Sequence, residues 1–149
     1  MRTEWRERFE KVTHAFSVAS ELADRWKAWL DDDRLWPQQT AFTHGELYPA
    51  HLLLGDDLGI RSVLDWTTAK VSDPALDFVY QWMIAEAPAF QTTIDAYEAA
   101  TGTVPTMLQE RCEAIMAASP MTYADFALTT GDDEHLKTAA TQLSQGAIA

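Results

Sequence analysis

Hydrophobic and polar residues alternate along the first part of the chain with the spacing of amphipathic helices. Residues 3–14 and 18–32 each place apolar side chains at intervals of three or four positions, which predicts one helix in each segment. Thr3 stands where a helix cap is expected. The apolar residues that define the two stripes are Trp5, Phe9, Val12, Leu22, Trp26, Trp29 and Leu30.

The middle of the chain has short apolar runs divided by turn residues, which predict strands instead of helices. Residues 40–43 and 51–54 form two such runs, and residues 60–66 form a third. The intervening segment 55–59 reads GDDLG, which is typical of a hairpin turn. We expect one small hairpin, with a polar loop at residues 44–50 leading into it.

From residue 73 onward, prolines and glycines divide the chain into further helices. Asp73-Pro74 is a favourable helix start, because Asp caps and Pro fits the first turn. The other expected boundaries are Pro88, Pro105 and Pro120 as starts, Gly102 and Gly131 as stops, and Asp132 or Asp133 as the last cap. The tail 144–149 is expected to fray.

These patterns predict one domain of the α+β class over residues 1–149, mostly helical. Its parts would be helices in 1–36, polar loops on a β-hairpin in 40–72, and a helical subdomain in 73–149. Hydrophobic residues make up 47% of the 149, which is enough for a packed core.

Net charge limits the kinds of partner that the chain can bind, and cysteine content bears on its cellular compartment. The net charge of −12 disfavours nucleic acid and anionic membranes as partners. The single cysteine, Cys112, cannot form an internal disulfide, and the N-terminal segment lacks the apolar core of a signal peptide. We therefore expect a cytoplasmic protein.

The candidate chemistry lies between residues 44 and 78, HGELYPAHLLLGDDLGIRSVLDWTTAKVSDPALDF. Glu46 is placed to accept a proton from an attacking hydroxyl, whereas Asp65 and His51 are placed to bind Mg²⁺ between nucleotide phosphates. Magnesium prefers oxygen ligands, so His51 either binds the metal weakly or hydrogen-bonds a phosphate. The spacing indicates phosphoryl transfer.

Four neighbouring residues have structural interpretations. We expect His44 to brace the loop through backbone hydrogen bonds and Gly45 to permit a tight backbone path. Asp73 is more simply a helix cap, whereas Asp77 is equally well a first-turn acid or a functional residue.

These motifs resemble those of the aminoglycoside phosphotransferase-like kinases, and most closely the macrolide 2′-phosphotransferase branch. The segments that carry the resemblance are HGELYPAHLLL, VLDWTTAKVSDPALDF and ASPMTYADFALTTG. The resemblance implies the C-terminal lobe of a protein-kinase-like fold. It also implies transfer of the γ-phosphate of GTP or ATP to the 2′-hydroxyl of a macrolide antibiotic, with Mg²⁺ as cofactor.

By position, the resemblance places Glu46 at the catalytic acid, where the family usually has Asp, and His51 and Asp65 at the metal positions. The extra methylene of Glu46 puts its catalytic competence in question. The helices after Asp73 would form the macrolide pocket, although ordinary core packing is the simpler interpretation for most of these residues. The pocket candidates are Asp77, Tyr80, Met83, Ile84, Phe90, Met116, Pro120, Met121, Tyr123 and Phe126.

No glycine-rich phosphate loop and no lysine-bearing strand is found in the sequence, so the N-terminal nucleotide lobe of such kinases is expected to be missing. The chain alone would then be inactive, and exposed apolar surface would favour a homodimer or binding of that lobe. Two alternatives remain open. One is a non-catalytic domain that binds a macrolide or another drug-like ligand, and the other is a related kinase for an aminoglycoside, choline or homoserine.

Overall fold

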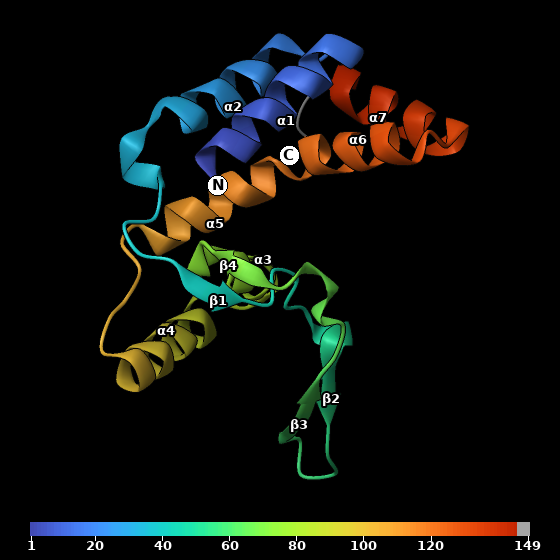
Figure 1. Cartoon of the computed structure of the whole chain (residues 1–149). Coiled ribbons are helices and arrows are strands. Elements are labelled where there is room, and N and C mark those ends of the chain that lie inside the picture. The colour runs from blue at the N-terminus through green and yellow to red at the C-terminus, as the bar shows by residue number, and fades with distance from the viewer. Residues whose placement is uncertain (146–149) are drawn as a thin grey trace. The chain divides into compact units, whose positions relative to one another are not determined.

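The computed structural model describes residues 1–145 and is mostly helical, with two small antiparallel sheets (Figure 1). The α-helices are α1 (Arg2–Ala15), α2 (Ser20–Asp31), α3 (Val79–Ile84), α4 (Ala87–Thr101), α5 (Leu108–Ala117), α6 (Ser119–Thr130) and α7 (Asp133–Gln145). The strands are β1 (Ala41–Thr43), β2 (Leu52–Leu54), β3 (Ile60–Val63) and β4 (Lys70–Ser72). Single 3₁₀ turns are η1 (Asp33–Leu35), η2 (Pro49–His51), η3 (Trp66–Thr68) and η4 (Pro74–Asp77). This composition confirms the predicted α+β, mostly helical class.

The chain forms two compact units. The first combines Met1–Trp36 with the chain from Ala114 onward, and the second is Pro37–Glu113. The predicted division at residue 73 differs, because α6 packs against both α1 and α7 and so joins the last helices to the first. Of the predicted frayed tail 144–149, residues 146–149 lie outside the described part of the chain.

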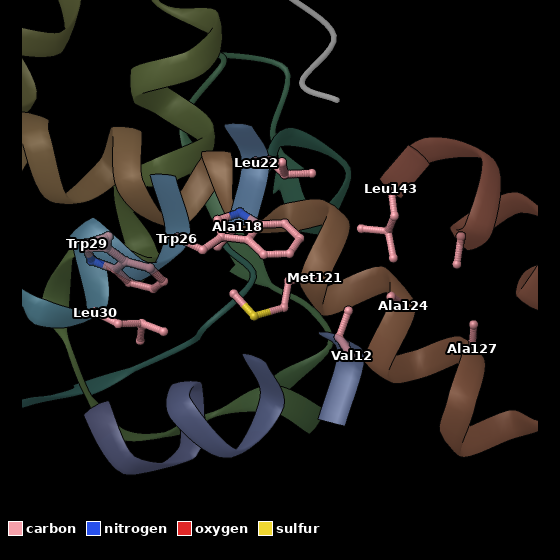
Figure 2. Close-up of a cluster of buried hydrophobic side chains, with 11 residues drawn as sticks. Val12, Leu22, Trp26, Trp29, Leu30, Ala118, Met121, Ala124, Ala127 and Leu143 are labelled. Carbon is pink, nitrogen blue, oxygen red and sulfur yellow. The ribbon is translucent and has the colours of Figure 1, made fainter. Parts of the chain in front are cut away.

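The first unit has a helical core in which large side chains meet small ones. Trp26 and Leu30 of α2 belong to one buried cluster with Met121 and the alanines of α6 (Figure 2). The indole Nε1 of Trp26 donates a hydrogen bond of 2.8 Å to the carbonyl of Ala117, so this buried donor is satisfied. The buried core residues are Val12, Leu22, Trp26, Trp29, Leu30, Ala118, Met121, Ala124, Ala127, Ala139 and Leu143.

The second unit contains both sheets. β2 and β3 form the predicted hairpin, in which Leu52 pairs with Val63 and an irregularity follows Leu53. β1 pairs with β4, so that Thr43 lies opposite Lys70. Strand β4 was not predicted from the sequence, and its pairing with β1 brings the loop after Thr43 next to Thr68 and Ala69, which precede the strand.

Several predicted boundaries need correction. Thr3 lies within α1, and Met1 is the residue that precedes the helix. The strand predicted to reach Trp66 ends at Val63, since Asp65 adopts a left-handed backbone conformation with φ 58°. The helix expected from Pro105 begins at Leu108, after Met107 with φ 49°. By contrast, Gly102 and Gly131 end α4 and α6 in left-handed conformations, as predicted.

Asp73 caps a 3₁₀ turn at Pro74–Asp77, and the α-helix follows only from Val79. At the last helix it is Asp132 whose carboxylate accepts hydrogen bonds from the backbone N–H groups of Glu134 and His135. No helix in the described part of the chain has the length and apolar content that crossing a membrane requires.

Candidate active site

Two histidines connect the peptide groups of Glu46 to the segment that carries Asp65. The backbone N–H of Glu46 donates to Nδ1 of His44 at 3.3 Å, and Nε2 of His44 lies 2.8 Å from the carbonyl of Leu64. Because a carbonyl oxygen only accepts, Nε2 carries the proton and Nδ1 is the acceptor. His44 is 3% exposed, so these bonds fix a neutral, buried imidazole in place. The contacts are of the kind expected for a loop-bracing residue.

His51 contacts the other backbone polar group of Glu46, its carbonyl. Its Nδ1 is 2.8 Å from the carbonyl of Glu46, so Nδ1 is the protonated nitrogen, and Nε2 is directed toward Asp65, 3.9 Å from Oδ2. The backbone N–H of Leu64 also donates to the carbonyl of His51 at 2.8 Å, just before the hairpin begins. The hairpin therefore brings the two acid-bearing segments together, although 19 positions separate Glu46 from Asp65 in the sequence.

Asp65 uses its two carboxylate oxygens differently. Oδ1 accepts hydrogen bonds from the hydroxyl of Thr67 at 2.6 Å and from its backbone N–H at 3.3 Å. The hydrogen bond from the Thr67 hydroxyl, and then the one from the Thr67 amide, lower the pKa of Asp65 below its ordinary value. Asp65 is therefore an ionised carboxylate at neutral pH, with Oδ2 on the side of His51.

His51 and Asp65 are the two residues predicted to bind metal, and the structure brings their side chains together. Among residues 1–145, no three His, Cys, Asp or Glu groups are close enough together to hold an ion. His51 and Asp65 are nevertheless adjacent and offer one nitrogen and one oxygen donor. A metal here would take its other ligands from water or phosphate, as Mg²⁺ commonly does in kinases.

The turn at His44-Gly45 is held by a carboxylate from further along the chain. Asp77 accepts hydrogen bonds from the backbone N–H of His44 at 3.0 Å and from that of Gly45 at 2.7 Å. Thr68 donates its hydroxyl to the carbonyl of His44 at 2.8 Å. Both oxygens of Asp77 are thus committed to the loop, so we place Asp77 with the bracing residues and not with the substrate contacts.

Asp73 is anchored in the interior of the second unit. Its Oδ1 accepts from the backbone N–H of Ala75 at 2.7 Å, as a helix cap does, and its carboxylate forms a buried ion pair with Arg111. Arg111 also donates to the carbonyl of Thr106 at 3.0 Å. Burial, and then the charge of Asp73, raise the pKa of the adjacent Cys112 thiol to about 12. Cys112 is therefore an inert packed thiol.

Tyr80 is another predicted substrate residue that lies beside the polar loop. Its ring is 5.3 Å from that of Tyr48, which in turn contacts the ring of His51 edge-on at 4.4 Å. Burial raises the pKa of the Tyr80 phenol, and the charge of Glu46 raises it further. Tyr80 thus lies within the electrostatic influence of the candidate catalytic acid.

The other predicted substrate residues divide between surface and interior. Met83 and Ile84 are exposed on α3 of the second unit, and Phe126 is exposed on α6 of the first. Phe90 is 7% exposed and packs on Phe78, and Met121 is fully buried, so we assign both to the interior. The remaining candidates are partly exposed, so their role as substrate contacts stays a prediction. They are Met116, Pro120 and Tyr123.

Sequence patterns did not point to Thr68 or Arg111, because their partners His44 and Asp73 lie 24 and 38 positions away in the sequence. Thr67 was also missed, although its partner Asp65 is only two positions away. The second unit also has a cavity of about 190 Å³ that is separate from the candidate site. Tyr97, Thr106 and Arg111 are among its lining residues, and none of the predicted site residues lines it.

Solved structures of macrolide-modifying enzymes are similar to this chain. The macrolide 2′-phosphotransferase MphH from Brachybacterium faecium is 39% identical, with a TM-score of 0.91 over 99% of this chain and 50% of that one. A macrolide 2′-phosphotransferase type I is 34% identical, with a TM-score of 0.87 over 96% of this chain and 48% of that one. The uncharacterized protein YcbJ of Bacillus subtilis is 37% identical over 86% of this chain and 42% of its own length.

This chain spans about half the length of those relatives. The fold is that of the C-terminal lobe in the kinase-like architecture, as the resemblance of the motifs implied. Residues 1–112, three quarters of the chain, match the model of the phosphotransferase enzyme family, APH. The chain therefore belongs to the phosphotransferase enzyme family.

Proposed function

We propose that this chain is the C-terminal, catalytic and substrate-binding lobe of a kinase that phosphorylates the 2′-hydroxyl of a macrolide. The hydroxyl oxygen attacks the γ-phosphorus of GTP or ATP, the bond to the β-phosphate oxygen breaks, and Glu46 takes the hydroxyl proton. The observation that carries the proposal is the pair of imidazole bridges joining Glu46 to the Leu64–Asp65 segment, in a chain 39% identical to a macrolide 2′-phosphotransferase.

The position of each site residue indicates the role that it would have in this reaction. Asp77 and Thr68 fix the backbone before Glu46, which matters because a displacement of about 1 Å can cost about 100-fold in rate. His51 and Asp65 would hold Mg²⁺, which when bound neutralises charge on the nucleotide phosphates. Met83 and Ile84, which are exposed on α3 of the second unit, would contact the apolar macrolide.

The substrate and the partner are also part of the proposal. A macrolide is large and apolar and carries a cationic amino sugar, which suits a chain of net charge −12 that exposes aromatic and Met side chains. The nucleotide would be enclosed by the half of the relatives that this chain does not span. Without that half we expect negligible turnover.

The test is reconstitution of the enzyme from two parts. The chain is co-purified with the amino-terminal half of the Brachybacterium relative, and erythromycin is supplied with GTP or ATP and MgCl₂. We expect the macrolide to gain one phosphate by mass spectrometry. Glu46→Gln and Asp65→Asn should each lower the rate by at least about 100-fold.

Asp56→Asn is the matched control, since Asp56 is an exposed acid in the turn of the same hairpin. No transfer from either nucleotide, with the two parts shown to be associated, would contradict the proposal. Calorimetric binding of erythromycin by such a complex, unaffected by Asp65→Asn and without transfer, would favour the non-catalytic binding domain.

A further inference from the structure

We propose that the His51–Asp65 pair gives this site a preference for Mn²⁺ over Mg²⁺. The inference rests on the proposed function, since it concerns the metal of the same site, and it adds a selectivity that follows from the donor atoms of this chain. It has three structural premises: the tautomer of His51, the free oxygen of Asp65, and the exclusion of His44 as a ligand.

The first premise is that His51 presents a lone pair and not an N–H group. Its Nδ1 lies 2.8 Å from the carbonyl of Glu46, so the proton of the neutral ring is on Nδ1 and Nε2 is unprotonated. A backbone carbonyl on the far nitrogen is the usual arrangement of a metal-binding histidine, because it fixes the ring and raises its basicity. The His51 side chain is 13% exposed, so the ring is held by its surroundings.

The second premise is that Asp65 keeps one oxygen for an ion. Thr67 occupies Oδ1, whereas Oδ2 faces Nε2 of His51 at 3.9 Å. Two ligands on one ion at bond lengths of about 2.05 Å are separated by about 2.9 Å at a right angle and about 4.1 Å when opposite. The observed separation of 3.9 Å lies close to the upper value, so a small movement of either side chain lets both atoms reach one ion.

The third premise is that the nearest other imidazole does not take part. His44 lies 5.6 Å from His51 between ring centroids, but both of its nitrogens are engaged with backbone groups of Glu46 and Leu64. The donor set is therefore one imidazole nitrogen and one carboxylate oxygen. Mg²⁺ binds oxygen almost exclusively, whereas Mn²⁺, as a transition-metal ion, accepts an imidazole nitrogen more readily than Mg²⁺ does.

The experiment measures metal binding directly and needs no turnover. Free Mn²⁺ is followed by electron paramagnetic resonance as it is titrated into the 149-residue chain, and Mg²⁺ is then added as a competitor. We expect Mn²⁺ to bind at least about tenfold more tightly than Mg²⁺. His51→Asn retains an oxygen donor, so it should weaken Mn²⁺ binding by about tenfold or more and leave Mg²⁺ binding nearly unchanged.

Asp65→Asn should weaken both ions, and His14→Asn, at an exposed histidine of α1, should weaken neither. Circular dichroism of each variant establishes that it is folded. As a second readout, Zn²⁺ added to ¹⁵N-histidine-labelled protein should shift one Nε2 resonance, and this shift should be absent in His51→Asn.

A preference for Mn²⁺ that survives His51→Asn would overturn the inference, as would equal affinities for the two ions in the unmodified chain. Either result leaves the proposed function intact as long as Asp65→Asn still abolishes phosphate transfer in the reconstituted enzyme. If transfer is insensitive to Asp65→Asn while the metal preference holds, the proposed function fails and the metal site stands alone.

Discussion

At the scale of single residues, Gly45 is constrained by both its backbone conformation and its neighbours. Its φ of 86° lies in the left-handed region, and a Cβ atom there would sit 2.9 Å from the carbonyl oxygen of Thr68. Its N–H is also bonded to Asp77 at 2.7 Å, so the peptide cannot rotate away without losing that bond. Glycine is thus required here for both backbone conformation and space.

We therefore expect Gly45→Ala to lower the free energy of unfolding by about 2–4 kcal/mol, by combining left-handed strain with the steric contact. Urea denaturation measures the loss. Gly102→Ala is the matched control, because Gly102 has a similar φ of 76° but no neighbouring atom within 4 Å of an added Cβ. Its loss should be only about 1–2 kcal/mol. Equal losses for the two variants would show that the Thr68 contact is unimportant.

The sequence allowed Glu46, His51 and Asp65 to be singled out because each is a rare residue type at a defined spacing. It did not show that both oxygens of Asp77 would bind the His44-Gly45 turn, which lies 32 to 33 positions earlier. Such contacts depend on the path of the chain between distant positions. Residue type and spacing alone do not determine that path.

At the scale of elements, Asp125 connects two helices of the first unit. Its carboxylate accepts from Arg8 at 3.0 Å and from Lys11 at 2.6 Å, which joins α6 to α1. Burial alone would raise the pKa of Asp125, but the hydrogen bonds and charges of Lys11 and Arg8 outweigh it and lower the pKa. A lowered folded-state pKa stabilises the fold above the unfolded-state pKa, and this contribution is lost as the pH falls through the folded value.

Asp125→Asn should therefore lower the free energy of unfolding by about 1 kcal/mol at pH 7, since both ion pairs are partly exposed. The difference from the unmodified chain should shrink below about pH 4, where the carboxylate of the unmodified chain becomes protonated. Urea denaturation at pH 7, 5 and 3 gives the comparison. Asp24→Asn, at an exposed position of α2, controls for the change in net charge. A difference that stays constant down to pH 3 would contradict this account.

Helices were easier to predict than strands for a physical reason. Gly102, Gly131 and Asp132 act locally at helix ends, so the sequence itself marks α4, α6 and α7. The strand Lys70–Ser72 has three residues and depends on its partner Ala41–Thr43, 27 to 31 positions earlier. Such a short segment carries too few alternating positions to be recognised before the pairing is known.

At the scale of the whole molecule, the second unit exposes more apolar surface than an isolated globular domain usually does. Phe42 of β1 is 66% exposed, its cross-strand partner Val71 is 68% exposed, and Trp66 stacks on Phe42 at 6.1 Å. The β2–β3 hairpin exposes more apolar side chains, at Leu53, Leu54, Leu58 and Ile60. Contiguous apolar surface of this kind marks an interaction site. We propose that the Phe42–Trp66–Val71 patch is covered by the other half of a full-length enzyme, or by a second copy when that half is missing.

The chain alone should therefore self-associate, and light scattering coupled to size-exclusion chromatography should show a mass that rises with concentration. Burial of one large apolar side chain contributes about 1.5–3 kcal/mol, so Phe42→Ser or Val71→Lys should weaken association by at least about tenfold. Phe126→Ser removes a phenyl ring that is 49% exposed on the first unit, and it should leave the mass unchanged. Adding the amino-terminal half of the Brachybacterium relative should convert the dimer into a one-to-one complex. A chain that stays monomeric at every concentration, and binds that half equally well with or without Phe42→Ser, would show that this patch faces solvent.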